Sequence, residues 1–162
     1  MIEVEYVQGQ TKASTSSGGK FIAKYGFSSN PSHFWRCSNR ERRPLPAYIW
    51  YNFKRASVTP AKVSFRPPQN VTHENARLWT PTKWQFVGSS ADDCYRLDRT
   101  DWTPLCGDLE GTEMKEMTEI RGCRVDEEIL QKPYKCLGIK VIDAIGPKYA
   151  AIHNLRMWVK KG

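Results

Sequence analysis

The chain has 162 residues, 40% of them hydrophobic, and a formal net charge of +8 at pH 7. This length is sufficient to bury a hydrophobic core, so we expect one domain spanning residues 1–162. No stretch approaches 18 consecutive apolar residues, so no membrane span is predicted. The basic charge is compatible with nucleic acid, acidic glycans or anionic lipid headgroups as partners.

Short runs in which apolar and polar residues alternate predict β-strands. At the N-terminus Ile2, Val4 and Tyr6 alternate with glutamates, as in an edge strand. Residues 10–32 are rich in Ser, Gly, Thr and Lys and predict a long ordered loop. Residues 47–53 are largely apolar on both faces, which predicts a central strand covered on both sides.

The rest of the chain continues the pattern. Further strands are predicted at residues 58–66, 82–88, 116–121, 134–143 and 150–159. In the last of these the inward face is ambiguous, because Ala151, Leu155, Met157 and Val159 are apolar at odd positions whereas Ile152 and Trp158 lie on even ones. A β-bulge would reconcile the two sets. Six Trp, seven Tyr and six Phe are concentrated in these runs and favour an all-β core.

No group of residues predicts catalysis or metal binding. The three histidines, His33, His73 and His153, fall in unrelated segments. Gly88 and Ser89 lack the second glycine of a nucleophile elbow, and no glycine loop suited to phosphate is present. The five cysteines form no Cys-x-x-Cys pair, which argues against a zinc ribbon. We therefore expect a protein that is not an enzyme.

Four segments in a fixed order carry a resemblance to a known family. They are the lone tryptophan of residues 34–36, "P-A-x-I-x-Y-x-F" at 46–53, "T-P-x-x-W-x-F-x-G-S" at 80–89 and "I-x-x-L-R-x-W" at 152–158. Together they resemble the galactose-binding-like superfamily, which includes discoidin domains (the coagulation-factor C type) and related carbohydrate-binding modules. The resemblance implies one discoidin-like jelly-roll β-sandwich of about eight main antiparallel strands, with a further strand at residues 101–105.

The resemblance also implies a ligand site in loops at one end of the sandwich, here residues 33–46 and 67–79. The candidate ligand-binding residues are His33, Trp35, Arg36, Asn39, Arg40, Arg42, Arg43, His73, Asn75, Arg77 and Trp79. Arginine binds carboxylate, sulfate or vicinal hydroxyls with paired N–H groups, and Asn or His bonds single hydroxyls. An exposed ring stacks on a sugar face. For Trp35 a core position is the alternative, because its counterpart in the family usually packs inside.

Three departures from the family limit what carries over. The calcium loop "Asp-Gly-x-x-Thr" is missing from residues 29–33 before Trp35, so no cofactor is predicted and a structural calcium is not supported. Trp79 stands where fucose-binding members have an aspartate, so fucose specificity is not supported. No cysteine lies near either terminus, which favours free thiols in a reducing compartment, with a Cys94–Cys106 bond as the alternative.

The predicted function is a non-catalytic, lectin-like module that binds glycans or glycoproteins, as in cell adhesion, and the arginines favour acidic glycans. The alternative is a protein–protein interaction domain, intracellular or at the cell surface, with no sugar ligand. Nucleic acid ranks lower because no basic stripe is interleaved with exposed aromatics. The N-terminus lacks a signal-peptide pattern, which leaves a cytoplasmic start or an excised extracellular domain open.

Overall fold

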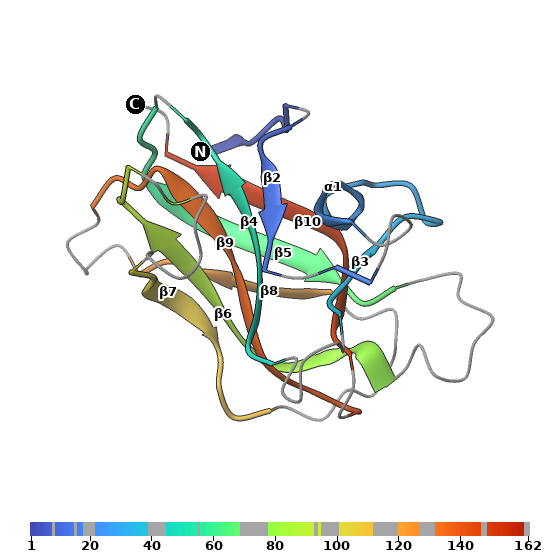
Figure 1. Ribbon diagram of the computed structural model, residues 1–162. Helices are drawn as coiled ribbons and strands as arrows, with labels where there is room; N and C mark the ends of the chain where they lie inside the picture. Colours follow the sequence, from blue (N-terminus) through green and yellow to red (C-terminus); the bar gives the residue numbers. More distant parts are fainter. Residues whose placement is uncertain are drawn as a thin grey trace.

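Two antiparallel β-sheets pack face to face in the part of the chain that is described (Figure 1). The computed structural model describes all residues except 8, 15, 18–21, 39–44, 55, 69–77, 93, 95–100, 112–119, 127–131, 147–148 and 161–162. The first sheet contains β1 (Ile2–Glu3), β10 (Ala151–Val159), β5 (Pro60–Arg66) and β8 (Arg121–Arg124) in that order, and β3 (Trp35–Arg36) also pairs with β10. The second contains β2 (Thr11–Ala13), β4 (Ala47–Asn52), β9 (Cys136–Ala144), β6 (Pro81–Ser89) and β7 (Thr103–Asp108). This architecture confirms the predicted all-β sandwich.

The core lies between the sheets and is made by alternate residues of the longer strands. Fully buried members include Phe65 of β5, Phe86 of β6, Ile139 of β9 and Leu155 of β10. Phe65 meets Trp84 edge to face, with ring centroids 4.9 Å apart. The alternation of apolar and polar residues that predicted these strands therefore also identifies the side chains that fill the core.

β4 and β10 confirm two detailed predictions. Ile49 and Tyr51 of β4 point into the main core, while Trp50 is buried on the opposite face, so the strand is covered on both sides. The pairing of β10 with β5 shifts register between His153 and Arg156, and Asn154 adopts a positive φ of 50° there. This bulge moves the core-facing positions from even to odd numbers.

The segment predicted as a long loop carries regular structure. Within residues 10–32, β2 pairs with β4 at the edge of the second sheet, and α1 (Ala23–Gly26) forms one helical turn. Gly26 of α1 packs so closely that a Cβ there would lie 2.5 Å from Ile49 and 2.9 Å from Trp35. Tertiary contacts thus order a polar segment whose local sequence favours a loop. The N-terminal edge strand is confirmed but ends at Glu3. Of the strand predicted at 116–121, residues 116–119 lie outside the described residues, and β8 begins at Arg121.

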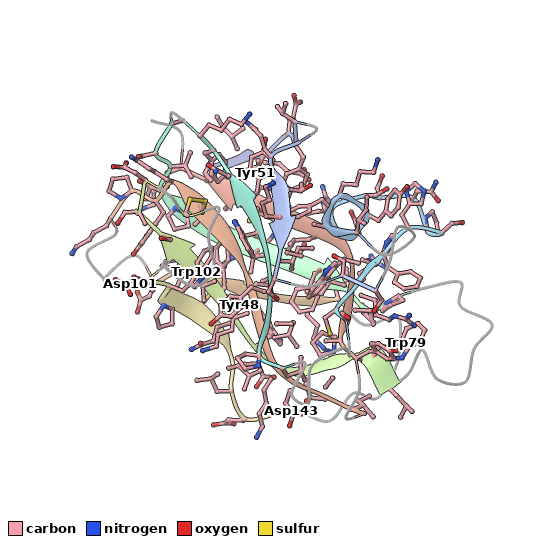
Figure 2. All side chains as sticks on the ribbon, viewed as in Figure 1. Tyr48, Tyr51, Trp79, Asp101, Trp102 and Asp143 are labelled. Atoms are coloured by element: carbon pink, nitrogen blue, oxygen red, sulfur yellow. A yellow bond between two sulfur atoms is a disulfide. The ribbon has the colours of Figure 1, made fainter. Side chains whose placement is uncertain are left out.

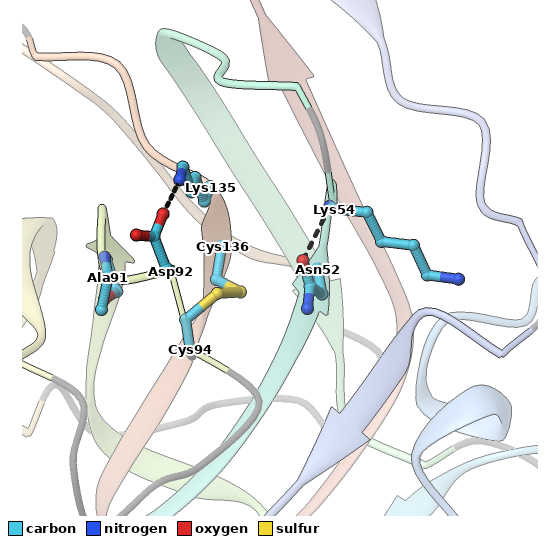
Figure 3. A network of polar contacts seen from close by, with 8 residues as sticks. Asn52, Lys54, Ala91, Asp92, Cys94, Lys135 and Cys136 are labelled. Atoms are coloured by element: carbon cyan, nitrogen blue, oxygen red, sulfur yellow. Dashed lines mark hydrogen bonds and ion pairs between the residues drawn. A yellow bond between two sulfur atoms is a disulfide. The ribbon is translucent and has the colours of Figure 1, made fainter.

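The cysteine expectations were wrong, because four of the five cysteines form two disulfides. Cys106–Cys123 joins β7 to β8, the edge strands of the two sheets. Cys94–Cys136 ties the connection after β6 to the start of β9, beside the ion pair of Asp92 and Lys135 (Figure 3). Cys37 remains an unpaired buried thiol. Spacing alone does not fix disulfide connectivity, and the partners here are distant in sequence.

Candidate functional site

The loop end is the end of the sandwich at which β3 and β6 meet the start of β10, and we define it by residues 34–37, 78–80, 145–146 and 149–151. Hydrogen bonds join these segments: the Gly146 N–H donates to the Leu78 carbonyl (2.7 Å) and the Ile145 N–H donates to the Thr80 carbonyl (3.0 Å). A Cβ at Gly146 would lie 2.7 Å from the Leu78 Cβ, so this close approach requires glycine. Figure 2 shows Trp79 at this end, apart from Tyr48 and Trp102 on the second sheet.

The centre of the loop end is the Arg36 guanidinium, which lies in the angle between two aromatic rings. Its Cζ is 4.6 Å from the ring centroid of Trp79 and 4.2 Å from that of Tyr149. The two rings are nearly perpendicular, at 81°, with centroids 6.1 Å apart. Trp79 is buried, 8% exposed, whereas Arg36, Phe34 and Tyr149 are half-buried. Each cation–π contact contributes about 0.5–1 kcal/mol and restricts the arginine to one orientation.

Backbone pairing fixes the position of Arg36. β3 pairs with β10 with Arg36 opposite Ala151, and the next residue, Cys37, donates its N–H to the Ala150 carbonyl (3.0 Å). Ala150 in turn donates its N–H to the Cys37 thiol sulfur (3.2 Å). Burial lowers the pKa of the Arg36 guanidinium and raises the pKa of the Cys37 thiol. The arginine therefore extends from a rigid strand rather than from a long loop.

His153 anchors the approach to the same strand from the β10 side. Its ring is buried, 3% exposed, and its Nδ1–H donates to the His33 carbonyl (2.7 Å). Burial is the main cause that lowers the pKa of His153, and the nearby positive charge of Arg66 acts in the same direction. The histidine is therefore a structural hydrogen-bond donor beneath residues 33–36, not a group exposed to a ligand.

The sequence-predicted residues are distributed between several locations. Arg36 and Trp79 come together at the loop end, as described. Trp35 is fully buried in the core, so its indole is not a surface platform for a ligand. His33 turns instead toward α1, where its ring lies 4.5 Å from that of Tyr25 and its Nδ1 is 3.1 Å from the Ser28 hydroxyl. The remaining candidates lie outside the described residues and stay predictions: Asn39, Arg40, Arg42, Arg43, His73, Asn75 and Arg77.

Sequence reasoning missed Tyr149 and Phe34. Phe34 packs near Trp79, with ring centroids 6.0 Å apart, and Tyr149 is the second ring on Arg36. The sequence signal that could have identified Tyr149 is an aromatic residue directly before the last strand and shortly after Gly146, which forms a turn.

Among the described residues, no helix has the length and apolar character needed to cross a membrane. The same residues contain no group of three or more His, Cys, Asp or Glu side chains suited to a metal ion.

Comparisons with known proteins identify the class of fold. No protein-family model and no curated protein sequence matches the chain. Solved structures do. The family 32 carbohydrate-binding module of Clostridium perfringens NanJ, in complex with galactose, superposes with a TM-score of 0.66 and 16% identity over 96% of this chain and 98% of that one.

Two further structures show the same fold. Chitosan-binding module 2 of a Paenibacillus chitosanase/glucanase, in complex with chitotriose, has a TM-score of 0.65 and 11% identity over 91% of this chain and 94% of that one. The family 32 module of AlyQ, in complex with 4,5-unsaturated mannuronic acid, has a TM-score of 0.64 and 11% identity over 98% of each chain. At these identities the likeness shows the fold alone: a galactose-binding-like β-sandwich.

Proposed function

We propose that this chain is a non-catalytic carbohydrate-recognition module that binds an acidic glycan at the loop end. The observation that carries the proposal is the Arg36 guanidinium held against Trp79 and Tyr149. A guanidinium presents five N–H donors in one plane, a geometry that suits carboxylate and sulfate groups. Because the rings and β3 already fix the side chain, binding a ligand costs little additional side-chain entropy.

The surrounding sequence supports an anionic ligand. The segment that follows Cys37 contains Arg40, Arg42 and Arg43, and the segment that precedes Leu78 contains Arg77. Both segments are adjacent in sequence to residues of the loop end, and their arginines add positive charge to this part of the sequence. The fold gives a second line of support, since solved structures that share it were determined with galactose, chitotriose and an unsaturated uronic acid. The two disulfides favour an oxidising compartment, where glycans of the cell surface are found.

The test is a glycan array probed without reductant at low and physiological salt, using the wild-type chain, Arg36→Ala and Arg156→Ala. Arg156 is the matched control because it also stacks on a tryptophan, Trp158 (5.2 Å), but lies at the far end of β10 and pairs with Glu3. We expect selective binding of uronate- or sulfate-bearing glycans, weakened about tenfold or more by Arg36→Ala alone. If both variants lose glycan binding to the same extent, the binding is explained by nonspecific attraction to positive charge and not by a site at Arg36. If no glycan on the array binds, the proposal of a glycan ligand is refuted and the alternative, a protein partner, is favoured.

A further inference from the structure

A polar pocket lies on the outer face of the second sheet. Figure 2 shows three of its lining residues, Tyr48, Asp101 and Trp102, near one another and apart from Trp79 of the loop end. The volume of the pocket is about 290 Å³, near the lower limit for small-molecule sites. We call it the outer-face pocket, and its lining residues are Tyr48, Gln85, Val87, Asp101, Trp102, Pro104 and Lys140. They come from β4, β9, β6, β7 and the residues just before β7.

Strand register brings the polar side chains of the pocket together. Tyr48 of β4 pairs with Lys140 of β9, and Lys140 pairs with Gln85 of β6, so the three form one row across the sheet. Their inward neighbours, such as Ile139 and Phe86, are fully buried in the core, which places the row on the outer face. The Lys140 ammonium lies 5.9 Å from the ring centroid of Tyr48. The row therefore presents a hydroxyl, a cation and an amide side by side.

Two aromatic rings form one wall of the pocket. Tyr48 and Trp102 stack at 24° with centroids 5.8 Å apart, and both are half-buried. Beneath them Trp50, 2% exposed, meets Trp102 edge to face at 5.6 Å. Trp50 fits there because β9 has glycine at 138: a Cβ on Gly138 would lie 2.5 Å from that of Trp50. The paired rings are thus supported from below by packed side chains rather than held only by solvent-exposed contacts.

The chemistry of the lining selects a class of ligand. Asp101 accepts hydrogen bonds, Lys140 donates them, and Gln85 does both, so donors and acceptors face the same space. The formal charges of Lys140 and Asp101 cancel, so the pocket does not favour a charged ligand. The Asp101 carboxylate would in addition repel an anionic ligand. Adjacent hydroxyls of a neutral sugar match this mixture, while the C–H face of a pyranose ring matches the Tyr48–Trp102 wall.

We propose that the outer-face pocket is a second carbohydrate site, specific for one neutral pyranose unit. The proposal shares the ligand class of the proposed function but does not depend on the loop end. The two sites would let one module bind an acidic and a neutral part of a glycan, or two glycan chains, and so gain avidity.

The experiment is a two-dimensional NMR titration of the full chain with the methyl glycosides of galactose, glucose, mannose and N-acetylglucosamine, and with glucuronic acid. We expect at least one neutral glycoside to shift the side-chain signals of Gln85 and the indole signal of Trp102. Gln85→Ala and Lys140→Ala should each weaken that binding about tenfold. Both side chains are half-buried on the sheet face, so these changes leave the core intact.

Lys62→Ala is the matched control, because Lys62 also lies over an aromatic ring on a strand, 4.5 Å from the centroid of Trp158, but on the other sheet. It should leave the binding unchanged. The proposal is overturned if no neutral glycoside shifts these signals, if glucuronic acid binds there more tightly, or if binding persists in both Gln85→Ala and Lys140→Ala. Arg36→Ala should not alter this titration, so failure of the loop-end proposal and failure of this one give different results.

Discussion

The loop end and the outer-face pocket both set a cation against aromatic rings, but they do so with different surroundings. At the loop end Arg36 lies between Trp79, which is buried, and Tyr149, on a strand flanked by arginine-rich sequence. In the outer-face pocket Lys140 shares its space with the carboxylate of Asp101. The fold is the same beneath both sites. Their difference in charge is the basis on which we propose different ligands for them, because local side chains rather than the fold set the chemistry of a site.

The strongest test of this comparison removes the disulfide beside the outer-face pocket. Cys94→Ala combined with Cys136→Ala should lower the free energy of unfolding by about 4 kcal/mol, because the bond closes a loop with a sequence separation of 42. Cys94 and Cys136 also pack with Trp50 under Trp102, so the pocket should lose its neutral-sugar binding. Urea unfolding and the NMR titration measure the two effects.

The second disulfide supplies the control. Cys106→Ala with Cys123→Ala removes a bond with a sequence separation of 17, for an expected loss of about 3 kcal/mol. It joins sheet edges and does not line the outer-face pocket. Similar loss of sugar binding in both double variants would mean that the pocket responds to global stability rather than to its local support.

Trp79→Ala is the corresponding test at the loop end. The indole packs on Ala151 and is 8% exposed, so its removal should cost about 3 kcal/mol and leave Arg36 with a single ring. Acidic-glycan binding should fall with it, while the indole signal of Trp102 stays in place. Thermal unfolding and the glycan array give the two readouts. A normal glycan profile in a folded Trp79→Ala protein would contradict the loop end as the site.

The sequence allowed the strands to be predicted but not all of the sites they carry. Alternation predicted the core faces, and the mixed parity of apolar residues in 150–159 predicted a bulge in β10 but not its position, because both are local patterns. Residues 10–32 were misassigned because β2 and α1 are ordered by contacts distant in sequence, such as the pairing of β2 with β4 and the close approach of Gly26 to Ile49. The loop-end site was predicted in part: Arg36 and Trp79 converge, but Tyr149 joins them only through strand pairing.

The outer-face pocket was missed for a related reason. Gln85 stands between Trp84 and Phe86, and Lys140 between Ile139 and Val141, which is the pattern of any strand with one solvated face. Only the pairing register of β4, β9 and β6 places them in one row. A polar residue in an apolar strand thus indicates which face of the strand is solvated. Predicting a binding site on that face also requires the register of the neighbouring strands.

A smaller effect is expected from replacing Arg36 with lysine. Arg36→Lys keeps the charge but loses the planar group that fits the angle between the Trp79 and Tyr149 rings. We expect acidic-glycan affinity to fall several-fold, about half of the loss in Arg36→Ala on a logarithmic scale, with little change in stability. Isothermal titration with the best array ligand measures this. An unchanged affinity would show that charge alone suffices, and would weaken the role given to the rings.

The smallest effect concerns the pH dependence of folding stability and comes from His153, the buried histidine beneath the loop end. The pKa of His153 is lowered in the folded chain, mainly by burial, so folding favours its neutral form. Its contribution to stability is therefore complete above the ordinary value of about 6.5 and is lost as pH falls from there toward the folded pKa. The Nδ1–H donates to the His33 carbonyl in both the neutral and the protonated ring, so this hydrogen bond gives ligand binding no pH dependence of its own. His153→Gln retains a hydrogen-bond donor without a titrating ring. The free energy of unfolding, measured with urea from pH 7.5 to 5 (about 2.5 pH units that include the ordinary histidine pKa), should depend less on pH in that variant. Identical pH profiles in the two proteins would assign the acid sensitivity to other groups.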